Sequence, residues 1–207
     1  MIKLYGLRMS NYYNLVKAAM IEKGLEFEEV KAPPTQKEDN LARSPMGKMP
    51  SIEVDGQYIS ESLAIVSYLE RAHPETSLLP ADPLEAAKAL ELALHIKLDV
   101  ELAARRLLPA AMFGGTASDE LVETTRNEVD RGMKAVSQLM VCKPYAAGET
   151  FTVADLYTYY SMGLASAITE KMFGAKLLAE YPQISELMAL LATRPSIARV
   201  TEEAAAK

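Results

Sequence analysis

The 207-residue sequence predicts an α+β domain followed by an all-helical domain. Three observations support this fold class. Strand and helix patterns alternate over residues 1–77, two prolines mark a linker at residues 78–83, and residues 84–207 carry helical periodicity without a strand pattern. A chain of this length is long enough for two small domains, each with its own hydrophobic core.

The first domain begins with a strand–helix–strand unit. Short β-type runs at residues 2–5 and 27–30 flank a helical pattern over residues 15–23. Gly24 follows this pattern as the expected residue after the helix C-cap. A unit of this kind favours a right-handed crossover between two parallel strands.

The second half of this domain is expected to contain a hairpin and a closing helix. After a short helical stretch at residues 38–43, strands are expected at residues 51–54 and 58–60. The Asp-Gly pair at residues 55–56 between them is a type I′ turn signal. A helix over residues 62–70 completes one sheet with helices packed against it.

The helical domain contains five segments with the 3.6-residue period of an α-helix. They cover residues 84–108, 118–140, 152–169, 176–178 and 183–193. The start of the third segment is well marked, because Thr152 is an N-cap residue and Asp155 stands three residues later, an acidic form of the capping box. Phe151 and Leu156 supply the hydrophobic staple of the same helix start.

Composition excludes several classes of function. The formal net charge of −6 argues against nucleic acid as the main partner. No apolar run reaches the roughly 18 residues of a membrane span, and no signal peptide precedes the first strand, so a cytoplasmic protein is expected. The single cysteine, Cys142, excludes an internal disulfide bond, and His73 and His95 match no metal-ligand spacing, so no metal is expected.

A proline, Pro50, opens the third expected strand. The order of strands and helices, with a proline at this place, is the pattern of a thioredoxin-like fold, in which the peptide bond before the proline is normally cis. The N–H and C=O groups of Met49 would then remain at the end of the sheet, where an extended peptide-like ligand can pair with them. The alternative is that Pro50 only starts a strand.

An acid and a hydroxyl, Glu61 and Ser62, begin the helix that follows the hairpin. A hydroxyl and main-chain N–H groups at a helix N-terminus bind carboxylates, and the helix dipole favours the anion. The adjacent Glu61 can hold an ammonium group. The pair therefore describes a site for the amino acid end of a ligand, with a simple N-cap at Ser60 or Ser62 as the alternative.

An amino acid head at Glu61 and Ser62, a peptide body at Met49 and a tail near Lys48 together describe glutathione. The motifs concerned are Gly47-Lys48-Met49-Pro50, Glu61-Ser62-Leu63-Ala64-Ile65, the capping box of residues 151–155 and Arg194-Pro195-Ser196-Ile197. On these motifs the chain resembles the cytosolic glutathione S-transferase family over nearly its whole length. It has features of the bacterial, serine-type members that are theta-, zeta- or tau-like.

The resemblance implies a role for each of these residues. Met49, before a cis Pro50, would bind the cysteinyl part of glutathione. Glu61 and Ser62 would bind the γ-glutamyl group, and Lys48 would reach the glycyl end.

The resemblance also divides the two domains by function. Residues 1–77 would form a thioredoxin-like glutathione-binding domain, and residues 78–83 the linker. Residues 84–207 would form an all-helical domain that carries the electrophile site and the contacts of a homodimer.

Three residues are candidates to stabilise the glutathione thiolate. Ser10 stands at the start of the first helix, where theta-, zeta- and tau-like members keep a catalytic serine. Tyr5 stands at the end of the first strand, where alpha-, mu- and sigma-like members keep a tyrosine. Ser10 is favoured because a hydroxyl at a helix N-terminus is well placed to donate to a thiolate, and Asn11 is the reserve donor.

The family's electrophile site corresponds to Tyr12, Arg105, Leu107 and Phe113, for each of which helix packing or solvation is the alternative. The function implied is that of a glutathione transferase, which activates glutathione as a thiolate for attack on a small hydrophobic electrophile. A glutathione-dependent isomerase, reductase or dehalogenase on the same fold is an alternative. A non-catalytic interaction protein of this fold is another.

Overall fold

The computed structural model describes residues 1–206, which form two compact units. The first unit contains Met1–Leu78 together with the end of the chain from Thr193 onward, and the second contains Leu79–Ala192. The break after Leu78 falls at the first residue of the expected linker. The α+β and all-helical character expected for the two parts is confirmed.

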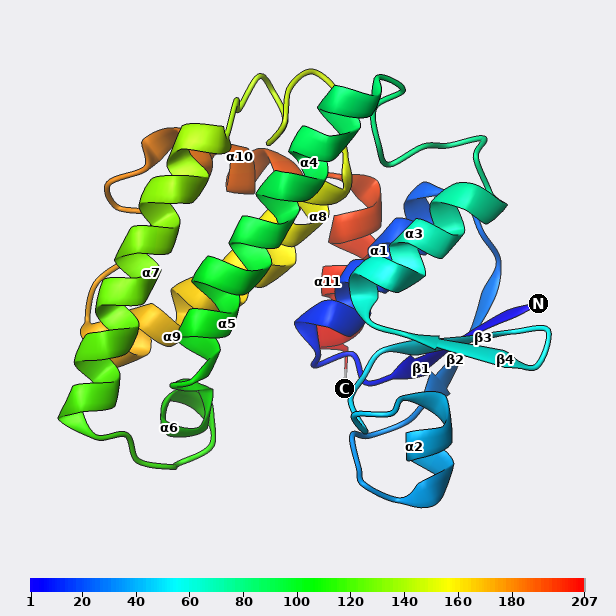
Figure 1. Cartoon of the computed structure of the whole chain (residues 1–207), viewed down its shortest axis with the longest axis horizontal. Helices are drawn as coiled ribbons and strands as arrows, with labels where there is room; N and C mark the ends of the chain where they lie inside the picture. Colours follow the sequence, from blue (N-terminus) through cyan, green and yellow to red (C-terminus); the bar gives the residue numbers. More distant parts are fainter. Residues whose placement is uncertain (207) are drawn as a thin grey trace. The chain divides into compact units, whose positions relative to one another are not determined.

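The first unit is built on a four-stranded sheet with the order β2-β1-β3-β4 (Figure 1). The strands are β1 (Ile2–Gly6), β2 (Phe27–Lys31), β3 (Ser51–Val54) and β4 (Gln57–Ser60). β1 pairs in parallel with β2 and antiparallel with β3, and β3 and β4 form a hairpin. Asp55 and Gly56 have φ values of 49° and 76°, as a type I′ turn requires.

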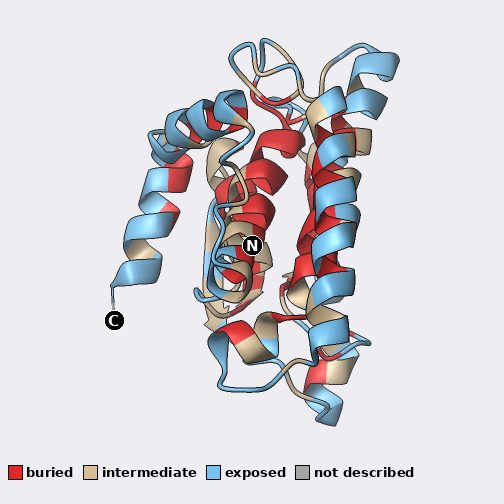
Figure 2. Ribbon diagram, turned by 90° about the vertical axis from the view of Figure 1, so that its left-hand side faces the viewer, coloured by how far each residue is buried: buried red, intermediate tan, exposed pale blue. Residues whose placement is uncertain are grey.

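Four helices complete this unit: α1 (Asn11–Glu22), α2 (Glu38–Arg43), α3 (Ser62–Ala72) and α11 (Pro195–Ala205). α1 and α3 pack against each other and against strands of the sheet. Leu4, Leu15, Ile52, Ile65 and Leu69 are fully buried and form the centre of this core. Figure 2 shows that buried and exposed residues alternate around many of the helices, as expected for amphipathic helices.

The last helix, α11, corrects the expected assignment of residues 84–207 to one helical domain. It packs on α1 and belongs to the first unit. The Nε and Nη2 atoms of Arg194 each donate to the carboxylate of Glu22 on α1 over 2.7 Å. Ile197 and Val200 on α11 are buried. The contacts that place α11 on α1 join residues far apart in the chain, so no local pattern in the sequence indicates this placement. The helix itself was not among the expected segments.

The regular secondary-structure elements of the second unit are all helices. They are α4 (Pro83–His95), η1 (Ile96–Glu101), α5 (Leu102–Arg105), α6 (Leu108–Met112), α7 (Asp119–Leu139), α8 (Val153–Tyr157), η2 (Thr158–Met162), α9 (Gly163–Phe173) and α10 (Pro182–Ala192). No helix within residues 1–206 is both long and apolar enough to cross a membrane.

Two of the expected helices contain a π-helical segment, η1 in one and η2 in the other. These segments pack against each other, and η1 also packs against α7. Gly132 of α7 allows the close approach, because a Cβ atom there would lie 2.3 Å from the carbonyl oxygen of Asp99 on η1. The expected helix at residues 176–178 is not formed. Gly174, with φ 68°, ends α9, and Pro182 starts α10, so the segment between them is a short turn.

The capping box at the start of α8 is confirmed. Thr152 Oγ1 accepts a hydrogen bond from the Ala154 N–H at 3.3 Å, and Asp155 Oδ2 accepts one from the Thr152 N–H at 2.8 Å. Asp155 Oδ1 accepts a further bond from the Ala146 N–H at 2.7 Å. The Asp155 carboxylate is fully buried, so it joins the preceding loop to the helix from inside the unit.

Candidate active site

Ser10 is the N-cap residue of α1. Its backbone is extended, and its Oγ accepts a hydrogen bond from the Tyr13 N–H at 3.3 Å. The Ser10 N–H donates to the Leu7 carbonyl at 3.0 Å, which fixes the turn before the helix. The cap bond uses a lone pair of the hydroxyl oxygen and leaves its proton to donate elsewhere. The half-buried side chain therefore combines a donor with the positive end of a helix dipole.

Tyr5, the second thiolate candidate, is engaged within the sheet. Its hydroxyl donates to Glu53 Oε2 at 2.5 Å, and the Lys3 ammonium contacts the same carboxylate at 3.2 Å. The Arg43 guanidinium lies 5.1 Å from the centre of the Tyr5 ring, and Tyr58 packs edge-on against that ring. Burial, followed by the hydrogen bond to Glu53, raises the pKa of Tyr5 to about 12.

The peptide bond between Met49 and Pro50 is cis, as the thioredoxin-like pattern predicts. Pro50 is buried, Met49 is half-buried and Lys48 is exposed. The pairing of β3 with β1 begins at Ser51, so the main chain of Met49 lies beyond the last paired residue of the sheet.

Glu61 is the N-cap residue of α3 and Ser62 is its first residue. Glu61 has φ 72° and ψ 119°, a sparsely populated region for a residue with a side chain. Such a conformation costs of order 1–3 kcal/mol and is concentrated at binding and catalytic sites. The Glu61 side chain is exposed and Ser62 is 3% exposed, so an acid at the surface adjoins a hydroxyl at the positive end of α3.

The register of the sheet brings these segments to one end of the first unit. Ser51 pairs with Tyr5 on one side and with Ser60 on the other. The end of β1, the start of β3 and the end of β4 therefore lie next to one another. Ser10 comes soon after the end of β1, Met49 comes just before the start of β3, and Glu61 directly follows β4. Two helix N-termini and a stretch of unpaired main chain meet there, an arrangement suited to a small peptide with carboxylate groups.

The remaining thiolate and electrophile candidates are spread over both units. Asn11 and Tyr12 are the first residues of α1 and are half-buried. In the second unit, Leu107 is a fully buried core residue, whereas Phe113 is 66% exposed. Arg105 donates from Nε to the buried carboxylate of Glu101 at 2.5 Å.

Sequence reasoning missed a cluster of charged side chains next to the Ser10 loop. Lys17 of α1 is 1% exposed and pairs with Glu29 of β2. The available signal was a lysine within the apolar run Leu15–Met20, on a helix whose other residues there are buried. Within residues 1–206, no group of three or more His, Cys, Asp and Glu side chains could hold a metal ion.

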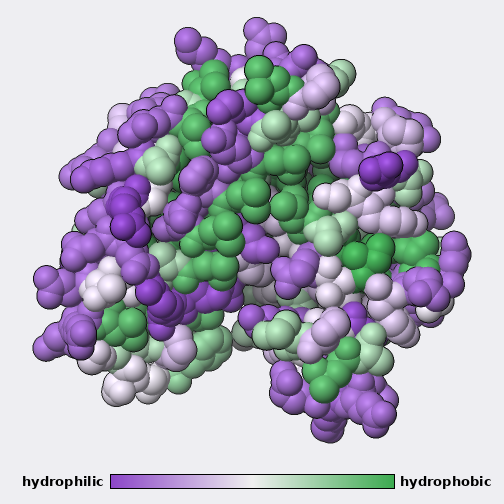
Figure 3. Space-filling model, viewed as in Figure 1, coloured by the Kyte–Doolittle hydropathy of each residue, from purple (hydrophilic) through white to green (hydrophobic). Residues whose placement is uncertain are grey.

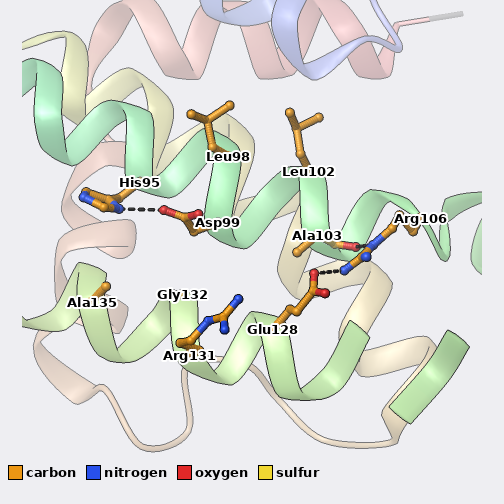
Figure 4. A pocket seen from close by; sticks show the side chains of 10 residues that line it. All are labelled: His95, Leu98, Asp99, Leu102, Ala103, Arg106, Glu128, Arg131, Gly132 and Ala135. Carbon is orange, nitrogen blue, oxygen red and sulfur yellow. Dashed lines mark hydrogen bonds and ion pairs between the residues drawn. The ribbon is translucent and has the colours of Figure 1, made fainter. Parts of the chain in front are cut away.

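A groove of about 470 Å³ lies in the second unit between η1–α5 and α7 (Figure 4). His95 Nδ1 and Asp99 Oδ2 lie within hydrogen-bond distance at 2.6 Å on one wall, and Arg106 pairs with Glu128 across the groove. None of the residues expected to bind glutathione lines this groove.

Comparison with known proteins identifies the family of this chain. The family profile of the glutathione S-transferase N-terminal domain matches residues 4–77, and that of the C-terminal domain matches residues 112–203. A glutathione S-transferase of Pseudomonas putida strain F1 is 39% identical over 200 residues, which cover 97% of this chain and 91% of that protein. The maleylacetoacetate isomerase of Pseudomonas aeruginosa is 28% identical and covers 94% of this chain and 93% of its own length.

A solved structure has the same fold. A glutathione S-transferase of Methylobacillus flagellatus KT with bound glutathione superposes with a TM-score of 0.82 at 22% identity, covering 97% of this chain and 98% of that one. The two family profiles and the 39% identical relative, taken with the cis Pro50 and the strained Glu61, lead to one conclusion. The chain belongs to the glutathione S-transferase family.

Proposed function

We propose that this chain is a glutathione transferase that binds glutathione at the end of the sheet where β1, β3 and β4 meet. The observation that carries the proposal is the double pairing of Ser51 with Tyr5 and Ser60. This register places a thiolate donor, a peptide-binding segment and an amino-acid-binding helix start beside one another. The matching family profiles and the glutathione bound in the Methylobacillus flagellatus structure support the choice of ligand.

Each part of glutathione meets a complementary group in this proposal. The γ-glutamyl carboxylate takes the Ser62 hydroxyl and the N-terminus of α3, while its ammonium group takes Glu61. The cysteinyl main chain pairs with Met49. The exposed Lys48 ammonium is the partner of the glycyl carboxylate.

Ser10 is the proposed donor to the sulfur. An ordinary thiol has a pKa near 8.5, so at neutral pH most of it is protonated and unreactive. A hydrogen bond to the thiolate, made by a hydroxyl at a helix N-terminus, lowers this pKa and raises the thiolate fraction. Tyr5 is less suited because its proton is held by Glu53.

The proposed reaction forms a bond between the glutathione sulfur and a carbon of the electrophile. The thiol releases its proton to solvent, and the sulfur lone pair forms a bond to an electrophilic carbon. In a substitution, this carbon expels its leaving group. In an addition to a double bond, the electron pair of the double bond moves to the neighbouring carbon, which then takes up a proton. A reduced thiol is required, which fits a cytoplasmic location, as does the single unpaired cysteine, Cys142.

The test is to bind the protein to immobilised glutathione and then to measure conjugation of glutathione with an activated aryl halide. Elution by free glutathione together with turnover is the expected result. Retention without turnover on any electrophile would favour the non-catalytic alternative. Absence of binding would refute the proposal.

A glutathione-dependent isomerase is the second candidate, because the 28% identical relative that covers 94% of the chain is a maleylacetoacetate isomerase. An isomerase adds glutathione to a cis double bond and releases it again after rotation, so total thiol is unchanged. A transferase consumes one thiol for each electrophile. Thiol titration during turnover of maleylacetoacetate and of an aryl halide therefore separates the two activities.

We further propose that the protein is a homodimer. Leu94, Leu98 and Leu102 follow one another at four-residue spacing along α4, η1 and α5, and they are 38%, 51% and 37% exposed. Figure 3 shows apolar surface gathered over these helices. An exposed apolar stripe of this kind is typical of a surface that binds another protein, and a second copy of the chain is the partner expected for this family.

A further inference from the structure

A cluster of five charged side chains and one tyrosine joins four elements of the first unit: the loop between β1 and α1, α1 itself, β2 and α11. Its members are Arg8, Tyr13, Lys17, Glu29, Arg199 and Glu203. None of them is a residue that binds glutathione in the proposed function. Their contacts lead from the last helix of the chain to the loop that carries Ser10.

Lys17 connects α1 to two other elements. Its ammonium group is buried and contacts Glu29 Oε1 on β2 at 2.7 Å and also the carboxylate of Glu203 on α11. A buried charge is strongly unfavourable unless partners with opposite charge surround it. Glu203 also accepts a hydrogen bond from Arg199 Nε at 2.8 Å. The position of Glu203 is thus fixed by the buried Lys17 on α1 and by Arg199 on its own helix.

Glu29 connects β2 to the loop before α1. It accepts hydrogen bonds from Arg8 Nη2 at 2.9 Å and from the Tyr13 hydroxyl at 2.5 Å, in addition to the bond from Lys17. Burial alone would raise the pKa of Glu29, but these three donors outweigh it and hold the pKa at about 2. The carboxylate is therefore ionised throughout the physiological pH range.

Arg8 stands two residues before Ser10, and both its side chain and its main chain are held. The guanidinium donates to Glu29 and, from Nη1, to the main-chain carbonyl of Glu203 at 3.2 Å. The Arg8 carbonyl accepts a hydrogen bond from Asn14 Nδ2 at 2.9 Å. Since the Ser10 N–H is bonded to Leu7, the whole turn from Leu7 to Ser10 depends on how Arg8 is held.

We propose that Arg8 and Glu203 are positioning residues for Ser10: α11 holds Arg8, and Arg8 holds the turn that presents the Ser10 hydroxyl to the bound thiol. The inference rests on the proposed function, in which Ser10 stabilises the glutathione thiolate. α11 is suited to this role because its other end is fastened to α1 by Arg194 and Glu22. It therefore supports the turn as a fixed element.

The test is a double-mutant cycle read through the thiol pKa of bound glutathione, measured from thiolate absorbance against pH. Glu203→Gln should raise this pKa by about half a unit or more, and lower kcat at pH 6.5 about threefold with little change in the KM for glutathione. The sign is diagnostic. If Glu203 acted only through its electric field, removal of its negative charge would favour the thiolate and lower the thiol pKa. If Glu203 instead positions Ser10, its loss weakens the hydrogen bond to the thiolate and raises the thiol pKa.

In the Ser10→Ala background, Glu203→Gln should cause no further change in the thiol pKa. Glu202→Gln, one residue earlier on α11 and exposed, is the matched control and should not raise the pKa. Arg8→Gln repeats the cycle from the other partner, so the test stands even if Glu203→Gln folds poorly.

The outcomes separate the two levels of the argument. A rise that depends on Ser10 supports the positioning role. An absent or negative shift, or an equal rise in both backgrounds, overturns that role while the proposed function stands. If Ser10→Ala itself does not move the thiol pKa, the assignment of Ser10 fails and the positioning role fails with it.

Discussion

The hydroxyl of Tyr5 donates a hydrogen bond to the carboxylate of Glu53, with the two oxygen atoms 2.5 Å apart. The residues lie on the adjacent strands β1 and β3, where Tyr5 pairs with Ser51 and Lys3 pairs with Glu53. The phenol proton is thus held by the sheet, and the pKa of Tyr5 is raised to about 12 by burial and by this bond. The cap bond of Ser10 differs, because in it the Ser10 oxygen accepts a hydrogen bond from the Tyr13 N–H. That bond does not use the hydroxyl proton of Ser10.

This relationship predicts how two substitutions will differ. Ser10→Ala should raise the pKa of the bound glutathione thiol by one to two units, because a charge-assisted hydrogen bond of about 1.5–3 kcal/mol stabilises the thiolate only. Tyr5→Phe should leave that pKa unchanged. Thiolate absorbance titrated against pH in both variants is the measurement. A shift in Tyr5→Phe alone would reverse the assignment, and a shift in neither would point to Asn11 or to the helix amides.

The amino acid end of glutathione is predicted to depend on Glu61 and Ser62. Glu61→Gln and Ser62→Ala should each weaken glutathione binding about tenfold or more, because each leaves one charge of the ligand without its partner. For Glu61→Gln the free energy of unfolding should change little, since Glu61 is exposed. Calorimetric titration measures the affinity, with Glu75→Gln as an exposed control in the same unit. Unchanged affinity in both variants would refute the site.

Asp155 is predicted to be the most sensitive helix-cap position in the second unit. Asp155→Ala should lower the free energy of unfolding by about 3 kcal/mol or more, because it leaves the Ala146 and Thr152 N–H groups buried without an acceptor. Ser118→Ala removes the exposed cap of α7 and should cost about 1 kcal/mol. Urea unfolding compares the two. Equal losses of unfolding free energy in the two variants would show that the buried Asp155 carboxylate contributes no more than an ordinary helix cap.

Glu29 is predicted to make stability depend on acid pH. Its pKa is about 2 in the folded protein against an ordinary value of 4.5, so its contribution is complete above pH 4.5 and is lost as the pH falls towards 2. The side chain is 27% exposed, and after allowance for solvent screening about 2 kcal/mol is expected. The difference in unfolding free energy between wild type and Glu29→Gln should shrink by this amount between pH 6 and pH 2.

The proposed homodimer predicts a mass in solution twice that of the chain. Leu98→Glu should convert the dimer into a monomer, because it places a charge in the middle of the apolar stripe on α4–α5. Leu190→Glu, at a similarly exposed leucine of α10, is the control and should stay dimeric. Light scattering at micromolar concentration measures both. A monomeric wild type would overturn the proposal.

Local sequence signals were sufficient for much of the fold. Asp55-Gly56 predicted the hairpin because few residues accept positive φ at two successive positions. Thr152 and Asp155 predicted a helix start because both bonds of a capping box are made within four residues. The main parts of the candidate site could be proposed from the sequence for the same reason, because a strand opened by a proline and two helices begun by hydroxyl residues are each encoded locally.

Features that depend on distant residues could not be predicted. The π-helical segment η1 packs closely on α7 at Gly132. The helical periodicity of the sequence does not show where the α-helix gives way to η1. Arg8 and Glu203 are 195 residues apart, so nothing near either residue indicates their contact. The sequence indicates a binding role for Glu61, but only the backbone angles reveal that this residue starts α3 in a strained conformation.

The discontinuity of the first unit has a consequence for the order in which the protein is made. A ribosome releases the chain from its N-terminus at about 5–20 residues per second, so Leu79–Ala192 emerges complete before α11 does. During that interval Lys17 and Glu22 lack their partners Glu203 and Arg194. The helical unit can therefore close its core before α11 docks, and the turn before Ser10 receives its last anchor only after α11 has emerged.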